Sequence, residues 1–275
     1  MIRRILVALS GTPFTKVAVR RAIELAQRHG AELTGVTIVD PKRIANVGPV
    51  PIGGQAAAAE LVEHRVEVTA EHVDEAIALF ESGCKGAGLT GVLDREEGEV
   101  LQRLAGLWRY HDLMIFGLRG LFDYGVVYNP DDTLARIVTR GISPIIAVSD
   151  EFREIRRVLI AYSGSVVSSK AMKRFAQMRP WVDVEVKVAS FGFKPEQAGP
   201  LLDGARTYLE SHGYAPETEN LPGDPREGLI QHATDWNADI IVMGAASRNR
   251  LAKLILGETA LGTVCHANTP LFLAS

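Results

Sequence analysis

The chain has 275 residues, of which 47% are hydrophobic and 23% charged. This length lies between one large domain and two domains of the usual size, about 150 residues each. The composition is that of a folded globular protein and excludes disordered and collagen-like chains. Thirty basic and 33 acidic side chains give a net charge of −3, which argues against nucleic acid or an anionic membrane surface as the main partner.

The two cysteines and the apolar runs indicate a cytoplasmic location. Cys84 and Cys265 lie far apart, and neither has a Cys or His neighbour at zinc spacing, so both are predicted to be packing residues. The apolar run after Arg3 and Arg4 covers only residues 5–9, which is too short for a secretion signal. No run approaches the roughly 18–20 apolar residues of a membrane span.

An internal repeat divides the chain into two halves. Residues 3–12 (RRILVALSGT) return as residues 156–165 (RRVLIAYSGS), with six of ten positions identical. The second shared pattern is an aspartate, four apolar residues and a glycine, at 112–117 and 239–244. The third is an X-Pro turn leading into a short apolar strand, and it closes each half. Such self-similarity predicts two copies of one fold.

Strands and helices alternate in each half. In chain order, strands are predicted at 4–9, 32–39, 89–93, 113–116 and 144–148, and then at 157–162, 183–189, 215–220, 239–243 and 271–274. The first half carries helical periodicity over 17–29 and 62–80. This order predicts an α/β fold: two tandem doubly wound domains, each a five-stranded parallel sheet of the Rossmann-like type with helices on both faces.

The two halves differ in length. The distance from the start of the repeated segment, at residues 3 and 156, to the shared aspartate is 109 residues in the first half and 83 in the second. Proline and glycine are frequent over 41–55, so the excess is predicted to be a loop inserted at about 41–58. We place the domains at 1–149 and 155–275, joined by a charged connector.

Small residues follow the first and fourth strands of each half. The turns after the first strands are Ser10-Gly11-Thr12 and Ser163-Gly164-Ser165, and those after the fourth begin at Gly117 and Gly244. In an open parallel sheet ligands bind outside the carboxyl ends of the strands. Glycine permits tight turns there, and inward-facing amides can hold an anion.

These features, in this order, resemble the universal stress protein family, here as a tandem of two such domains. The most specific match is in the second half, at 223–230 (GDPREGLI), 238–244 (ADIIVMG) and 254–257 (LILG). The resemblance covers essentially the whole chain. It implies a fold like that of the adenine nucleotide alpha hydrolases and, for many members, ATP as a ligand, with Mg²⁺.

The resemblance also implies which residues would hold the nucleotide. ATP-binding members carry Gly-x2-Gly-x9-Gly-Ser/Thr after the fourth strand and an aspartate at the end of the first. Carried onto the second half, the contact set is Ala161, Ser163, Met243, Gly244, Ser247, Gly257, Glu258 and Thr259. Ser163 stands in place of the aspartate, Ser247 in place of the middle glycine, and Glu258 in place of the Ser/Thr.

The first half departs further from the motif. Gly117 and Gly120 match, but Pro130 and Asp131 stand where the last glycine and hydroxyl are expected, and Ser10 replaces the aspartate. Proline has no amide hydrogen to donate, and a carboxylate repels a phosphate at close range. The first half is therefore predicted not to hold a triphosphate.

Three further patterns have simpler interpretations. Residues 164–170 lack the glycine before the lysine of a phosphate-binding loop, so they indicate a helix cap followed by a first-turn lysine. His64 and His72 flank glutamates on the polar side of a helix, which predicts a solvated face rather than a metal site. Ser10 and Ser163 lack the surroundings of a nucleophile, which favours helix capping. The sequence thus predicts no catalytic residue and no metal site.

Three functions remain open. The first is a cytoplasmic stress-response protein that acts by binding, with its halves forming an intramolecular pseudo-dimer and with ATP as a regulatory ligand of the second half. The second is a slow nucleotide hydrolase that uses Glu258 in the same crevice. The third is an interaction protein that has lost both nucleotide sites. Association of two such chains into a homodimer also stays open.

Overall fold

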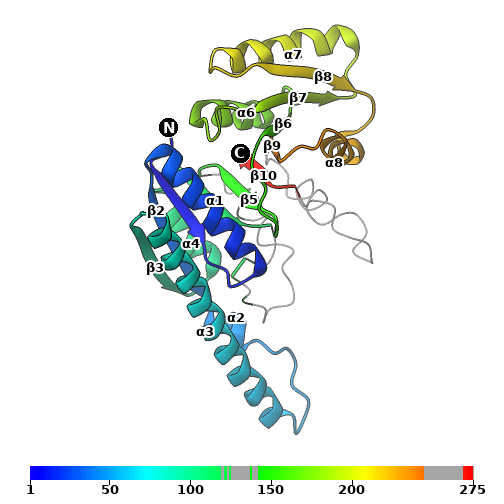
Figure 1. Ribbon diagram of the computed structural model, residues 1–275. Coiled ribbons are helices and arrows are strands. Elements are labelled where there is room, and N and C mark those ends of the chain that lie inside the picture. Colours follow the sequence, from blue (N-terminus) through cyan, green and yellow to red (C-terminus); the bar gives the residue numbers. More distant parts are fainter. Residues whose placement is uncertain (119–120, 123, 125–136, 138–141, 245–268, 275) are drawn as a thin grey trace. The chain divides into compact units, whose positions relative to one another are not determined.

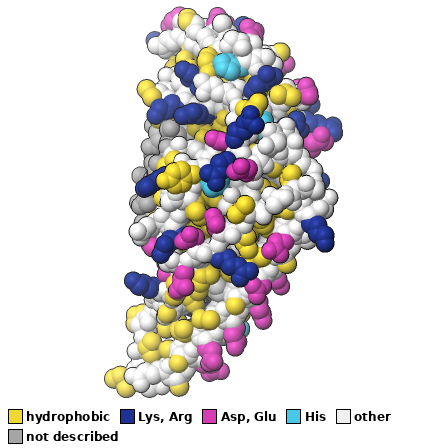
Figure 2. Space-filling view, turned by 90° about the vertical axis from the view of Figure 1, so that its left-hand side faces the viewer, with side chains coloured by type: hydrophobic (Ala, Val, Ile, Leu, Met, Phe, Trp, Pro, Cys, Tyr) yellow, Lys and Arg dark blue, Asp and Glu magenta, His cyan; other side chains and the backbone are white. Residues whose placement is uncertain are grey.

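The computed structural model describes residues 1–118, 121–122, 124, 137, 142–244 and 269–274 (Figure 1). The chain divides into two compact units. The N-terminal unit is Arg3–Leu134, and the C-terminal unit consists of Met1–Ile2 and Ala135–Ser275. No helix of the described residues is long and apolar enough to cross a lipid bilayer. On the face shown in Figure 2, basic and acidic side chains both occur, and neither sign covers the surface alone.

The N-terminal unit contains a parallel sheet with the strand order β3-β2-β1-β4. Its elements are β1 (Arg4–Ala8), α1 (Pro13–His29), β2 (Glu32–Val39), α2 (Pro41–Ala45), α3 (Gln55–Gly86), β3 (Gly91–Glu97), α4 (Val100–Trp108) and β4 (Leu113–Gly117). Helices α1 and α3 contact each other on one face, and α4 packs on β2 and β3 from the other (Figure 1). Strand β4 is buried along its whole length, as expected for a strand covered on both faces.

The C-terminal unit repeats this arrangement with the strand order β5-β10-β9-β6-β7-β8. Its elements are β5 (Ile145–Val148), β6 (Arg157–Ala161), α6 (Val166–Met178), β7 (Glu185–Phe191), α7 (Pro195–Glu210), β8 (Pro216–Leu221), α8 (Pro225–Asp235), β9 (Ile240–Gly244) and β10 (Leu271–Ala274). Strand β5 is antiparallel to β10, whereas β10, β9, β6, β7 and β8 are parallel. The α/β class and the doubly wound strand order are confirmed.

The predicted fifth strand of the first half pairs with the end of the second half. Strand β5 lies antiparallel to β10, with Ile145 opposite Leu273, and it belongs to the C-terminal unit. Both strands are fully buried. Their pairing leaves neither apolar strand as an exposed sheet edge on this side. The compact units therefore divide near residue 135. Domain boundaries at 149 and 155 stay a prediction.

The extra length of the first half is largely helical rather than a loop. Residues 41–45 form α2, capped by the Asp40 side chain, which accepts from the amides of Lys42 and Arg43 at 3.1 and 3.2 Å. Helix α3 begins at Gln55 and has 32 residues, whereas α7 has 16. Within 41–58, residues 46–54 are the part that lacks a helix or strand. The loop predicted at 41–58 is thus wrong at both ends, because proline and glycine there mark helix starts.

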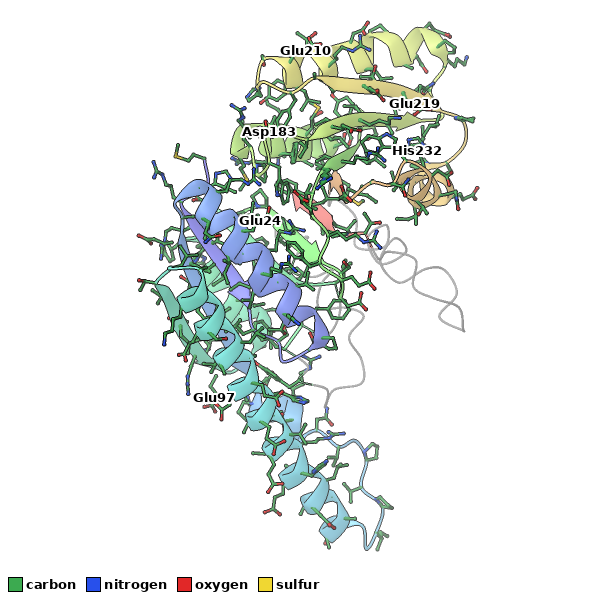
Figure 3. The ribbon with its side chains drawn as sticks, in the orientation of Figure 1. Glu24, Glu97, Asp183, Glu210, Glu219 and His232 are labelled. Atoms are coloured by element: carbon green, nitrogen blue, oxygen red, sulfur yellow. The ribbon has the colours of Figure 1, made fainter. Side chains whose placement is uncertain are left out.

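Strand β3 extends further than the apolar pattern predicts. It continues through Asp94 to Glu97, which lies opposite Val39 of β2 (Figure 3). Because β3 is the outer strand of the described sheet, its charged side chains reach solvent and discourage pairing with another chain. The apolar pattern ends at residue 93 because charged residues follow it.

The repeated aspartates tie the first strand of each half to the fourth. A carboxylate oxygen of Asp112 accepts from the amides of Arg3 and Arg4 at 2.7 and 3.0 Å. In the same way Asp239 accepts from the amides of Arg156 and Arg157, both at 2.8 Å. The parallel ladder would otherwise leave these amides without a strand partner. The aspartates lie at the amino ends of the strands, away from the ligand edge, so their role is structural.

Replacing Asp239 with asparagine is expected to lower the free energy of unfolding by about 1 kcal/mol, because two charge-assisted hydrogen bonds become neutral ones. Urea denaturation of the whole chain measures this. The control is Asp183→Asn, since Asp183 is exposed (Figure 3); it should change the value by less than about 0.5 kcal/mol. Equal effects of the two substitutions would contradict the assigned role.

Candidate functional site

The predicted residues of the second half that the structure describes lie together at the carboxyl edge of the sheet. Ala161 ends β6, and Met243 and Gly244 end the neighbouring parallel strand β9. The chain order reverses here, because β7 and β8 lie on one side of β6 and β9 on the other. Ala161, Met243 and Gly244 are half-buried, so this edge is open to a ligand as far as the described residues extend.

Gly244 brings β9 against the start of α6. A Cβ atom at this position would lie 2.7 Å from the Val167 carbonyl carbon and 2.8 Å from the Ser168 amide nitrogen. Both atoms belong to backbone, so a larger residue would force the helix away from the strand. Glycine therefore keeps the first turn of α6, with the positive end of the helix dipole, beside the strand edge.

Three serines surround this helix start. The Ser163 hydroxyl donates to the Ser165 hydroxyl at 3.0 Å, and Ser165 Oγ and Ser168 Oγ are 3.1 Å apart. Ser165 caps α6, its side chain accepting from the Ser168 amide at 3.3 Å. Ser163 itself is exposed. The arrangement offers hydroxyl groups and a helix N-terminus to an anionic ligand.

Helix capping falls two residues after the serines for which it was predicted. The N-cap residues are Thr12 for α1 and Ser165 for α6. Each is followed three residues later by a hydroxyl side chain, and the Thr12 amide donates to Thr15 Oγ1 at 3.1 Å. This spacing is the signal that sequence reasoning missed. Ser10, in contrast, is buried, and its hydroxyl has no hydrogen-bond partner among the described residues.

The same repeat positions are closed in the N-terminal unit. Ala8 and Ser10 are 1% and 3% exposed, and Gly117 is buried. Their counterparts Ala161, Ser163 and Gly244 are exposed or half-buried. Among the described residues, the two crevices share their topology but differ in the exposure of these repeat positions.

Tyr124 accounts for much of this closure. Its side chain is 1% exposed, and its hydroxyl both donates to the Ile38 carbonyl and accepts from the Ile38 amide, each at 3.2 Å. Strand β1 pairs with β2 only as far as Val36, through Ala8 and the Leu9 amide. The Ile38 groups thus face the space beyond the end of β1, and the phenol fills it.

Neighbouring side chains hold Tyr124 in place. His72 Nδ1 lies 2.7 Å from the Tyr124 carbonyl oxygen. A Cβ at Gly11, which has φ +63°, would lie 2.8 Å from both His72 Cβ and Tyr124 Cδ1. Burial raises the pKa of the Tyr124 phenol well above its usual range, so the ring is neutral. The solvated face predicted for His72 is therefore wrong, whereas His64 is exposed as predicted.

Two other interpretations of the sequence are confirmed. Residues 164–170 form a cap and the start of α6, with Lys170 exposed on the helix. Cys84 is 3% exposed on α3, and burial raises the pKa of its thiol, as expected of a packing residue. The following residues named above lie outside the described residues: Gly120, Pro130, Asp131, Ser247, Gly257, Glu258, Thr259 and Cys265.

The doubly wound sheets, with glycine and serine turns at their carboxyl edges, define an α/β protein whose fold is like that of the adenine nucleotide alpha hydrolases. A profile of the universal stress protein family matches residues 1–120 and 154–274. The chain belongs to the universal stress protein family, as a tandem of two family domains.

Individual relatives agree with this assignment. Universal stress protein Slr1230 of Synechocystis sp. is 24% identical over 284 residues, covering 98% of each chain. Stress response protein NhaX of Bacillus subtilis is 35% identical over 73 residues, which is 26% of this chain and 44% of that protein. The crystal structure of a universal stress protein from Archaeoglobus fulgidus superposes with a TM-score of 0.64 at 15% identity, covering 99% of this chain and 98% of that one.

Proposed function

We propose that this protein acts in the stress response of the cytoplasm by binding an adenine nucleotide, ATP with Mg²⁺, in the crevice of its C-terminal unit. The nucleotide is a regulatory ligand and not a substrate. Stress roles appear in the names of the relatives, NhaX among them. The two domains, at 1–149 and 155–275, act together as an intramolecular pseudo-dimer.

One contrast carries the proposal. Repeat positions that are buried in the N-terminal unit, Ala8 and Ser10, are open in the C-terminal unit as Ala161 and Ser163. The open crevice combines a helix N-terminus with serine hydroxyls, a combination that suits a phosphate chain. The closed crevice is filled by Tyr124. A single chain is therefore expected to bind one nucleotide.

The backbone suggests how the purine base would be held. The Tyr162 amide donates to the Ala189 carbonyl at 2.9 Å, and the Leu9 amide donates to the Val36 carbonyl at 2.8 Å. Phe191 lies two residues after Ala189, as Ile38 lies two residues after Val36. Because backbone groups alternate along a strand, the amide and carbonyl of Phe191 face the space beyond the end of β6. A neighbouring donor and acceptor suit the edge of adenine, which carries both kinds of group.

A crevice-blocking substitution tests the proposal. Wild-type protein with millimolar Mg-ATP is expected to melt at higher temperature than protein alone, because a ligand of the native state stabilises it. Ser163→Tyr fills the crevice from an exposed position and should remove the shift. Ser82→Tyr, on the exposed side of α3, should leave it unchanged. A wild-type protein that shows no shift would overturn nucleotide binding.

The two alternative functions have separate tests. If the protein hydrolyses ATP, Glu258→Ala is expected to lower the rate of phosphate release. An unchanged rate would show that Glu258 takes no part in hydrolysis. If the protein has no nucleotide site, purified protein should release no adenine nucleotide when it is denatured. Anion-exchange chromatography of the supernatant measures this.

A further inference from the structure

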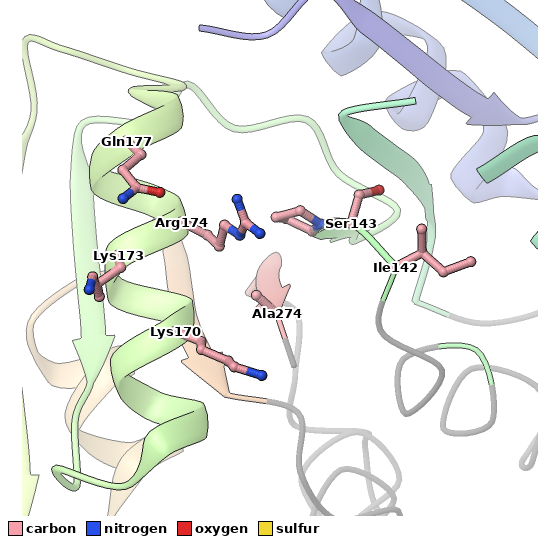
Figure 4. Close-up of a pocket in the computed structure, with 8 residues that line it drawn as sticks. Ile142, Ser143, Lys170, Lys173, Arg174, Gln177 and Ala274 are labelled. Carbon is pink, nitrogen blue, oxygen red and sulfur yellow. The ribbon is translucent and has the colours of Figure 1, made fainter. Parts of the chain in front are cut away.

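A cleft of about 410 Å³ lies beside α6 in the C-terminal unit (Figure 4). Its lining comes from three segments: residues 142–144 ahead of β5, the exposed side of α6, and Ala274 at the end of β10. The volume falls within the range of small-molecule sites, roughly 300–1,000 Å³. Ala274 of β10 pairs with Gly244 of β9, so the cleft lies on the β10 side of β9, whereas the crevice lies between β9 and β6.

The charged side chains that line the cleft among the described residues are all basic. They are Lys170, Lys173 and Arg174. Figure 4 shows Lys170 and Arg174 directed from α6 toward Ala274. None of the three cations makes an ion pair with an acidic residue in the part of the chain that the structure describes. A concentration of positive charge in a hollow attracts a multivalent anion.

The internal repeat shows that this charge is specific to the second half. Arg174 corresponds to Arg21 of α1, which is 1% exposed and paired with Glu24. Figure 3 labels Glu24. The position of Glu24 is occupied in α6 by Gln177, whose amide donates to the Tyr208 hydroxyl at 3.2 Å. Lys170 replaces the buried Val17. The second half thus keeps the arginine, loses its acidic partner and has its lysine at the position of Val17, whereas Ser169 stands at the position of Lys16.

The opposite wall adds a polar group and an apolar surface. The Ser143 hydroxyl oxygen is buried and has no hydrogen-bond partner among the described residues. A buried hydroxyl without a partner is costly, so a ligand atom that accepts a hydrogen bond from it would be favoured. Ile142 and Pro144 line the same wall and can contact the carbon atoms of a ligand.

We propose that this cleft binds a small organic phosphate, a phosphomonoester whose dianion is held by Lys170 and Arg174. A phosphate dianion carries two negative charges and so pairs with two cations, whereas a carboxylate carries one. The guanidinium group can bind phosphate through two parallel hydrogen bonds. The carbon skeleton of the ligand lies along Ile142 and Pro144. The inference does not depend on nucleotide binding in the neighbouring crevice.

Isothermal titration calorimetry on the intact chain, saturated beforehand with Mg-ATP, tests the site. The probes are glycerol 3-phosphate and inorganic phosphate at low ionic strength. We expect glycerol 3-phosphate to bind at least as tightly as phosphate, and Lys170→Met/Arg174→Met to weaken both at least tenfold. Gln177→Glu restores the acidic residue of the first half and should also weaken binding.

The control is Lys16→Met/Lys85→Met, which removes two exposed charges that do not line the cleft and should leave the affinity within about twofold. Equal weakening by the two double variants, or no heat with 10 mM of either probe, would overturn the proposal. Because the nucleotide crevice is filled first, failure here is distinguishable from failure of ATP binding. If inorganic phosphate bound more tightly than glycerol 3-phosphate, the proposal that the ligand carries an organic group would be overturned.

Discussion

Replacing Tyr124 with alanine is expected to lower the free energy of unfolding by about 3–5 kcal/mol, the usual cost of truncating a buried aromatic residue. The ring is 1% exposed, and its hydroxyl satisfies both backbone groups of Ile38. Truncation leaves a cavity and two unpartnered polar groups. Urea denaturation of the intact chain gives the value.

Two companion variants separate the parts of this effect. Tyr124→Phe keeps the ring and removes only the hydroxyl, so a loss of about 1–3 kcal/mol is expected. Tyr110→Ala is the control, because Tyr110 is 69% exposed and its replacement should cost less than about 0.5 kcal/mol. If Tyr124→Ala cost no more than Tyr110→Ala, the crevice of the N-terminal unit would not be closed by Tyr124.

Substituting Gly244 with alanine is expected to destabilise the chain by about 1–3 kcal/mol, the range found for overpacked interiors. The added Cβ would lie within 2.8 Å of two backbone atoms of α6, and backbone cannot move aside as a flexible side chain can. Thermal denaturation followed by circular dichroism measures the change.

A second glycine gives the matched control with the opposite sign. Gly199 lies inside α7, and a Cβ there meets no atom within 4 Å. Gly199→Ala should therefore stabilise the protein by about 0.5–1 kcal/mol, since alanine restricts the unfolded chain and favours helix. Stabilisation by both substitutions would contradict the close approach of β9 to α6.

The repeat made most of the fold predictable. The Arg-Arg strand starts and the Asp-apolar-Gly strands fixed the alignment of the halves, and Asp112 and Asp239 prove to connect those two strands physically. Periodicity then located the helices. It failed at β3, whose charged end at Glu97 lies on the sheet edge, and at 41–58, where α2 and the start of α3 stand.

The site was only partly predictable, for a physical reason. Ala161, Ser163, Met243 and Gly244 could be found because glycine and serine turns follow strands that the repeat identifies. Tyr124 could not, because its hydrogen bonds reach Ile38, 86 residues away, and no motif connects the two. The basic cleft likewise joins Ser143 to Arg174 across separate segments. Contacts between distant segments leave no local pattern in a single sequence.

The most direct test of the account is the stoichiometry of Mg-ATP binding to the intact chain, measured by isothermal titration calorimetry. We expect one nucleotide per chain, bound in the crevice of the C-terminal unit and abolished by Ser163→Tyr, with Tyr124→Phe leaving both stoichiometry and affinity unchanged. Two nucleotides per chain, or one that survives Ser163→Tyr, would contradict the central claim that only the second crevice is open.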